Sequence, residues 1–333
     1  MNVEALHRLR QWLKRSDLVR IHVCRPETFA WLTGGGDNTV ISGEAVASLD
    51  VSQEDIILCT SSIEERRFAE EETPELRIRT HPWWRVLPTP KPNDLEHDLT
   101  PLRLALSEPE VERFRRLGAD AASATGSVLR EASPTWTERE LAGAISEELV
   151  AQGCRPSALL VAGEERAFKH RHPLPTSKQL DGLCMAVVCA TRQGLTANLT
   201  RMRSWGNRQA PALYEQVLKV EARALDATRP GKTLADVIKV IRDEYASVDQ
   251  ADAFEQHHQG GIAGYRSREI LATADCATEL ETGMAIAWNP SLPGAKVEDT
   301  FVLSPSGLDN LTSDPAWPTT RIQGRDRTDL LVS

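Results

Sequence analysis

A proline-rich passage divides this chain of 333 residues into two parts. Three prolines stand at alternate positions within residues 88–92, and such a run is typical of a linker rather than of a helix or a strand. Shortly after it, Ser107 is followed three residues later by Glu110. This spacing is a helix-start signal, because both side chains can accept hydrogen bonds from backbone amides at the beginning of a helix. We therefore expect one domain over residues 1–100 and a second over residues 107–333.

The first part has the pattern of a small α/β domain. Apolar residues spaced for one helix face open the chain and lead into a strand expected over residues 18–24. Three consecutive glycines at residues 34–36 lack the lysine and the serine or threonine of a phosphate-binding loop, so we expect a turn rather than a nucleotide site. The next strand is expected over residues 38–42.

The second part contains two pairs of expected helices separated by strand-like segments. After the helix that begins near Ser107, a second capping pattern at Thr137 and Glu140 predicts another helix. Two further helices are expected over residues 211–228 and 234–245. Periodicity alone therefore classifies this part as α+β.

The charge of the chain restricts its partners. It has 39 basic and 48 acidic residues, a net charge of −9, whereas nucleic acids and anionic membranes favour a basic surface. No stretch approaches the roughly 20 apolar residues of a membrane span, and the start has no basic segment followed by an apolar one. We expect a cytoplasmic protein that acts on small molecules or peptides, with no nucleic-acid or membrane partner.

Four segments of the second part resemble a known family. Residues 187–201, 257–269, 288–290 and 296–299 resemble the signature segments of the creatinase/aminopeptidase P/methionine aminopeptidase superfamily. The resemblance implies an α+β chain with a pita-bread catalytic domain over residues 107–333, preceded by a small α/β creatinase-type N-terminal domain. It also implies a homodimer.

The resemblance places five positions where the family holds a dinuclear metal centre, and only one of them keeps a carboxylate. Where the family has two aspartates, a histidine and two glutamates, this chain has Val187, Asn198, Gly261, Asn289 and Glu298. Two divalent ions in one site need several anionic oxygens to offset their charge, and one carboxylate with two neutral amides supplies too few. We predict no catalytic metal and no other cofactor.

Creatinase, a member of the superfamily that works without metal, indicates three catalytic positions. By ungapped spacing its catalytic histidine falls on His170 and its second active-site histidine on His257, which we predict to be catalytic, while its carboxylate-binding arginine falls on Arg268, which we predict to bind the substrate. Histidine can exchange a proton near neutral pH, and the arginine fork suits a carboxylate. His172 is the alternative to the favoured His170 as the acid/base group. Of the neighbours His257 and His258, we expect one to face the site and the other to be structural.

The resemblance also predicts which residues contact the substrate. Creatinase holds the cationic group of creatine with two glutamates, whose places here are Thr200 and Asn289. A cationic substrate is therefore not expected, and the site should suit a neutral amide, imine or heteroatom-bearing group beside a carboxylate. Buried without metal, Glu298 should either pair with Arg201 or take up a proton and become a second acid/base group. The predicted substrate-binding residues are Arg268, Asn198, Asn289, Arg201, Trp288, His172 and His258.

Three functions remain open at this point. The first is a metal-independent, creatinase-like enzyme that uses histidine acid/base chemistry on a C–N or related bond of a small carboxylate-bearing molecule. Hydrolysis is the default, with elimination, isomerisation or cyclisation as alternatives, in a tailoring or catabolic step. The second is a catalytically inactive peptidase homologue that binds a peptide or protein partner. The third is a metallopeptidase with non-standard ligands, drawn from His170, His172, His257, His258 and Glu298.

Overall fold

The computed structural model describes residues 1–41 and 43–333. The chain divides into two compact units, which separate after residue 107, except that a three-residue turn at 193–195 groups with the first unit. Both units contain helices and strands, so the expected mixed α and β character is confirmed. Among the described residues, no helix is both long and apolar enough to cross a lipid bilayer.

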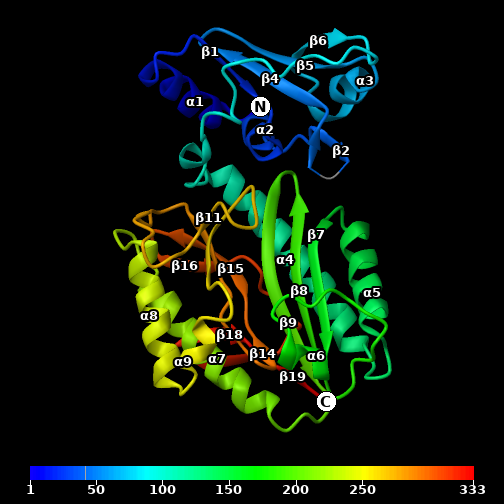
Figure 1. The fold of residues 1–333 in the computed structure, drawn as a ribbon, viewed down its shortest axis with the longest axis vertical. Helices are drawn as coiled ribbons and strands as arrows, with labels where there is room; N and C mark the ends of the chain where they lie inside the picture. Colours follow the sequence, from blue (N-terminus) through cyan, green and yellow to red (C-terminus); the bar gives the residue numbers. More distant parts are fainter. Residues whose placement is uncertain (42) are drawn as a thin grey trace. The chain divides into compact units, whose positions relative to one another are not determined.

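A four-stranded sheet in the order β1-β4-β5-β6 forms the centre of the first unit (Figure 1). Helix α1 begins after its N-cap Asn2, whose side chain accepts a hydrogen bond from the first turn, and it buries Leu9 and Leu13 on the predicted apolar face. The strand predicted over residues 38–42 reaches Ser42, which lies outside the described residues. The elements of this unit are α1 (Val3–Arg15), β1 (Arg20–Val23), α2 (Pro26–Thr33), β2 (Thr39–Ile41), β3 (Glu44–Ala45), β4 (Ala47–Ser52), β5 (Ile56–Ser61), α3 (Glu65–Arg67), η1 (Phe68–Glu72), β6 (Arg77–His81) and η2 (Thr100–Leu102).

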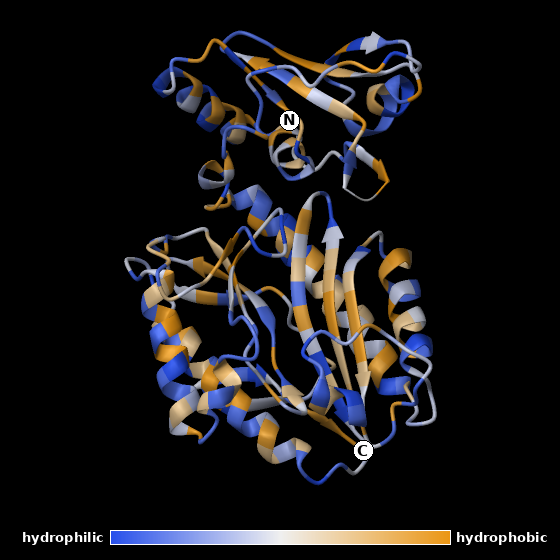
Figure 2. Ribbon diagram, in the orientation of Figure 1, coloured by the Kyte–Doolittle hydropathy of each residue, from blue (hydrophilic) through white to orange (hydrophobic). Residues whose placement is uncertain are grey.

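The second unit has two halves, each made of a sheet and a pair of helices. In the first half the strand order is β19-β9-β8-β7, and α4 and α5 pack against this sheet (Figure 1). Strand β8 is apolar over most of its length (Figure 2). It is buried on both faces, as is typical of a strand with layers on both sides. The elements of this half are α4 (Glu108–Glu131), α5 (Glu138–Ala151), β7 (Arg155–Gly163), α6 (Glu164–Lys169), β8 (Leu183–Arg192), β9 (Leu195–Ser204) and β19 (Leu331–Val332).

The other half contains a five-stranded sheet in the order β11-β10-β12-β15-β16. Helices α7 and α8 pack against each other in this half, and α7 contacts β13, β14 and β17. Its elements are α7 (Ala210–Ala227), α8 (Leu234–Ser247), α9 (Ala251–Phe254), β10 (Gly260–Ala263), β11 (Ile270–Leu271), β12 (Ala285–Trp288), β13 (Ser291–Leu292), β14 (Ala295–Lys296), β15 (Asp299–Ser304), β16 (Gly307–Asn310), β17 (Thr319–Ile322) and β18 (Arg325–Thr328).

The predicted helices of this unit are confirmed. The capping box at Thr137 and Glu140 forms in full, since each side chain accepts a hydrogen bond from the other residue's backbone amide. Helix α4 begins directly after Ser107, and α7 and α8 begin within one residue of their predicted starts. Local capping and periodicity were therefore sufficient to locate these helices.

The two halves meet where strand register brings several polar residues to one face. Strands β12 and β15 are antiparallel, and one further step along their ladder places Asn289 opposite Glu298. A bridge joins Thr200 of β9 to Glu298, and Asn198 lies two residues before Thr200 on the same strand. Paired residues, and residues two apart in a strand, project from the same face. Asn198, Asn289 and Glu298 therefore project together.

Candidate active site

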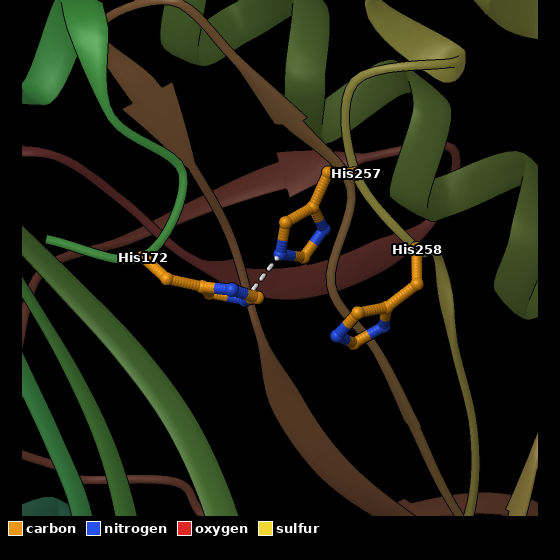
Figure 3. Close-up of side chains that lie close together, drawn as sticks. All are labelled: His172, His257 and His258. Carbon is orange, nitrogen blue, oxygen red and sulfur yellow. Dashed lines mark hydrogen bonds between the residues drawn. The ribbon is translucent and has the colours of Figure 1, made fainter.

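Three histidines lie together in the second unit. His172 comes from the loop that follows α6, whereas His257 and His258 are neighbours in the loop between α9 and β10 (Figure 3). Nε2 of His172 lies 3.0 Å from Nε2 of His257, and the rings of His257 and His258 are stacked with their centres 4.4 Å apart. One nitrogen of the His172–His257 pair must therefore carry a proton and donate it to the other.

The histidines of this cluster are uncharged at neutral pH. Burial, followed by the charge of Lys296, lowers the pKa of His257 to about 2. Burial, followed by Arg268 and Lys296, lowers the pKa of His258 to about 4, and burial and Lys296 also lower the pKa of His172. A neutral imidazole has one donor and one acceptor nitrogen, so each ring can take a proton from one group and give one to another.

A buried ion cluster acts on these histidines. Oε1 of Glu298 accepts a hydrogen bond from Nη2 of Arg268 (2.7 Å), and Oε2 accepts one from Oγ1 of Thr200 (3.2 Å). Nζ of Lys296 lies 3.8 Å from Oε2, and both side chains are almost fully buried. Burial alone would raise the pKa of Glu298, but Lys296 and Arg268 outweigh it, so the pKa is lowered. Glu298 is thus an ionised carboxylate shared by two cations.

The expectation that Glu298 either pairs with Arg201 or takes up a proton is wrong. Nη1 of Arg201 donates to Oδ1 of Asp299 at 2.9 Å, and the two neighbouring cations keep Glu298 ionised. Glu298 is therefore the counter-ion of the cluster and does not fit the part of a general acid. Arg201 is fully buried and also donates to the carbonyl oxygen of Thr312, so its guanidinium holds Asp299 and the segment after β16 rather than Glu298.

Several buried polar atoms here have no hydrogen-bond partner in the described part of the chain. They are Oδ1 of Asn198 and of Asn289, Nε of Arg268, and Nδ1 of His257 and of His258. Nδ2 of Asn198 donates to the carbonyl oxygens of Thr196 and Ser267, which fixes the orientation of the amide and turns Oδ1 away from them. Because buried polar atoms are nearly always paired with protein, ordered water or a ligand, their concentration at one place makes this the candidate binding site.

The residues present do not fit the dinuclear metal centre that the resemblance implies. Val187 offers no ligand atom, and both oxygens of Glu298 are already engaged. Gly261 has a φ of 153°, and a Cβ at this position would lie 2.1 Å from the carbonyl oxygen of Ile270. The backbone itself therefore excludes a histidine where the family has its metal ligand.

The histidine cluster, by contrast, has the composition of a single-metal site. His172, His257 and His258 offer nitrogens that all lie within 4.8 Å of one another, and three histidines hold zinc in some enzymes. Lys296 and Arg268 oppose a divalent ion here, because buried like charges repel one another. Two chemistries therefore compete for this cluster, namely proton transfer and the binding of one metal ion.

His170 is not a member of the cluster. It is exposed at the C-cap of α6, where its backbone amide donates to the carbonyl oxygen of Arg166. The geometry therefore does not support the preference for His170 over His172, because the turn after α6 brings the later histidine to His257. Counting residues back from a motif without gaps cannot detect that the loop of this chain differs from the family's by two residues.

Trp288 does not line the site either. Its side chain is fully buried, and Nε1 donates to Oγ1 of Thr228 (2.8 Å). Neighbouring residues in an extended segment project to opposite faces, so Trp288 points away from the face that Asn289 shares with Glu298. The geometry therefore does not support its predicted contact with the substrate.

Lys296 is the one member of the ion cluster that the sequence analysis missed. It is the last residue of β14 and stands two residues before Glu298, and its flanking residues Ala295 and Val297 are apolar and buried. This pattern could have revealed Lys296 in the sequence. In an extended segment, a lysine two positions before an acid projects from the same face as the acid, while its apolar neighbours project from the other face.

Two cavities among the described residues lie away from this cluster. One of about 360 Å³ lies beside α9 and is lined by residues that include Gln256 and Pro293. The other, of about 270 Å³, lies in the first unit between Cys24, Cys59 and the loop that carries Pro88. Neither is lined by a histidine of the cluster, in which His172 is exposed and His257 is buried.

Comparison with known proteins is consistent with this architecture. The profile of Metallopeptidase family M24 matches residues 112–305. An uncharacterised peptidase of Staphylococcus saprophyticus is 25% identical over 233 residues, which cover 66% of this chain and 65% of that protein. The probable dipeptidase PepE of Mycobacterium tuberculosis is 25% identical over 226 residues, which cover 64% of this chain and 60% of that protein. The chain thus spans less than two thirds of either relative.

A solved structure agrees over a longer range. The prolidase from Pyrococcus horikoshii superposes with a TM-score of 0.78 and 18% identity, over 93% of this chain and 98% of the prolidase. This likeness confirms the expected pita-bread domain preceded by an N-terminal domain.

Proposed function

Because the chain belongs to metallopeptidase family M24, we propose that it is a pita-bread enzyme that acts on a small carboxylate-bearing molecule without the family's dinuclear metal centre. The bond is a C–N or related bond, and hydrolysis is the first reaction to test. The probable dipeptidase PepE is one of the curated relatives, so dipeptides and other N-acylated amino acids are the substrates to begin with.

The observation that carries this proposal is the ion cluster beside the histidines. Arg268 and Lys296 both lie within 4 Å of the Glu298 carboxylate, and they place positive charge where the family resemblance implies metal ions. Positive groups fixed in a buried site stabilise a substrate carboxylate, or negative charge that develops during the reaction, without reorganising. This chain's own side chains can therefore supply the electrostatic part of the catalysis.

The histidines would supply the proton transfers. In hydrolysis, water adds its hydroxyl to the carbon of the C–N bond and its proton reaches the leaving nitrogen. A neutral ring of the His172–His257 pair can accept the proton from water and then deliver it to nitrogen. A bound carboxylate beside Lys296 would offset part of the positive charge that lowers the pKa of His257, so the substrate would make this ring a stronger base. Elimination, isomerisation or cyclisation would need the same acid/base group without the water.

The test compares two histidine variants in protein freed of metal. The protein is treated with a chelator, its metal content is measured, and products from a panel of dipeptides and N-acyl amino acids are followed by mass spectrometry. His257→Ala should lower turnover by about 100-fold or more. The matched His170→Ala should leave it unchanged, since His170 lies outside the cluster. Equal losses of turnover in both variants would contradict the roles assigned to His257 and His170. If no protein, parent or variant, turned over any substrate of the panel, the result would favour a protein that only binds its ligand.

A single-metal peptidase is the second candidate, favoured by the spacing of the three histidine nitrogens. In that case one transition-metal ion per chain would be found in protein purified without chelator, and activity would disappear with the metal. Loss of the metal in His172→Ala or His258→Ala would locate it at the cluster and overturn the metal-independent proposal.

A further inference from the structure

We infer that Lys296, with Arg268, forms a binding site for the negatively charged group of the ligand, and that Asn198 and Asn289 accept hydrogen bonds from an N–H group of the same molecule. The ligand class is therefore a small acid that carries an N–H group close to its carboxylate, such as an N-acyl amino acid. The inference rests on the proposed function in placing the ligand at this site.

The first step is the charge balance around Lys296. The charged groups that act on it are the carboxylate of Glu298 and the guanidinium groups of Arg268 and Arg171, while the thiol of Cys189 is uncharged because burial raises its pKa to about 11. One negative charge therefore faces three positive ones, counting Lys296 itself. The neighbouring histidines are neutral and do not offset the difference. A buried surplus of positive charge is costly unless an anion joins it.

The second step is that the cations have free donors. The ammonium of Lys296 lies 3.8 Å from Glu298, too far for a hydrogen bond. The side chain is only 2% exposed, and at this distance its donors are not used by Glu298. In the described part of the chain, Nε of Arg268 is buried and unpaired. Because Lys296 and Arg268 approach the same carboxylate, their unused donors can converge on a second anion beside it.

The third step is that the acceptors lie on the same face as the cations. Strand register places Asn198 and Asn289 on the face of Glu298, and Lys296 joins them because it lies two residues before Glu298. The Oδ1 atoms of both asparagines are buried and unpaired. An anion alone would leave these acceptors unpaired and would repel them. A ligand that carries an N–H group beside its anionic group satisfies both the cationic donors and the asparagine acceptors.

Isothermal titration calorimetry with N-acetylglycine tests the inference, because this probe carries a carboxylate and an adjacent N–H group. Acetate, which lacks the N–H group, should bind more weakly, and the methyl ester of N-acetylglycine, which lacks the charge, should not bind. Lys296→Met should weaken N-acetylglycine binding by at least about tenfold, the loss expected for a hydrogen bond to a charged group. The control Lys178→Met removes an exposed lysine that pairs with Glu165 and should have no effect.

Glu298→Gln provides a test in the opposite direction. Removing the counter-ion increases the positive charge at the site, so N-acetylglycine should bind more tightly and should raise the unfolding temperature of this variant more than that of the parent. If the cluster only stabilises the fold, both variants would lose stability with no opposite effects on binding. That result, or an absence of binding by the parent protein, would overturn the inference.

These measurements are independent of turnover. A parent protein that binds N-acetylglycine through Lys296 but converts no member of the substrate panel would contradict the proposed function and support the anion site. If the parent and Lys296→Met turned over a substrate equally well, the result would support the proposed function and contradict the anion site.

Discussion

At the scale of single residues, the site is defined by which groups carry charge. Lys296 and Arg268 hold Glu298 ionised, and their positive charge together with burial keeps His257 and His258 neutral. A neutral histidine beside a cation is a weak base until an anion arrives, so ligand binding and proton transfer are coupled through the same few charges. Two predictions follow from the state of individual residues.

The neutral histidines predict that the protein loses stability in mild acid. The pKa of His258 is about 4 in the folded chain and near 6.5 when unfolded, so between these values the unfolded chain binds a proton that the folded chain does not. Stability therefore falls as the pH is lowered through this window, by about 2 kcal/mol for His258 between about pH 7 and pH 5. Urea unfolding at the two pH values measures the change. His258→Asn should show a smaller loss, and an identical loss in parent and variant would contradict the assigned pKa.

Gly261 predicts that the family's metal ligand cannot simply be restored. Its φ of 153° and the 2.1 Å approach of a Cβ to the carbonyl oxygen of Ile270 mean that Gly261→Ala should destabilise the fold by about 2–4 kcal/mol. Gly143 in α5 has open space around its missing Cβ, so Gly143→Ala should stabilise by up to about 1 kcal/mol. Chemical denaturation of both variants gives the comparison. Equal effects would show that the backbone at Gly261 can relax.

At the scale of elements, a second buried ion network joins parts that lie far apart in sequence. Arg327 of β18 donates to Glu221 of α7 (2.6 Å) and to Asp299 of β15 (2.7 Å), and Asp299 also accepts from Arg201 of β9. All four side chains are almost completely buried. The network thus connects a helix to three strands and supports the segment from which Glu298 projects into the site.

Arg327→Met should therefore destabilise the protein by about 3–5 kcal/mol, because it leaves two carboxylates buried with less compensation. Lys239→Met removes the exposed ion pair with Asp243 on α8 and should cost less than about 0.5 kcal/mol. Thermal or urea unfolding of the two variants tests the contrast. A small effect at Arg327 would mean that water or a protonated Glu221 replaces the lost partner.

The starts and ends of the helices were the features that local sequence predicted best. The capping box at Thr137 and Glu140 forms as expected, and the glycine run ends α2 with Gly34 in the left-handed conformation. Both features depend on residues within one turn of each other, so no tertiary contact was needed to locate them.

At the scale of the whole molecule, the chain keeps the M24 fold, whereas four of the positions where the family resemblance implies metal ligands carry other residues. The pita-bread domain still brings strands from two halves to one site, and the ion cluster lies where those halves meet. Association into a homodimer, which the family resemblance implies, stays a prediction that light scattering in solution can test.

The loss of the metal positions predicts how the whole protein responds to metal ions. A ligand that binds only the folded state raises the unfolding temperature. Mn²⁺ and Co²⁺ should therefore leave this temperature unchanged after chelator treatment, because the dinuclear positions cannot hold them. Differential scanning calorimetry with and without each ion measures the response. A rise with Zn²⁺ that disappears in His257→Ala would instead support a single metal ion at the histidine cluster.

Capping and periodicity in the sequence were enough to locate the helix starts, and the resemblance of four segments to the family's signatures indicated the family and the four positions, including Val187 and Gly261, where its metal ligands are replaced. These are properties of which residue stands at a given position relative to a motif. Only the tertiary structure decided that His172 rather than His170 lies beside His257, that Arg268 rather than Arg201 pairs with Glu298, and that Lys296 completes the cluster. The physical reason is that side-chain partnerships depend on the path of a loop and on the register between strands, and neither is encoded by the spacing within one segment.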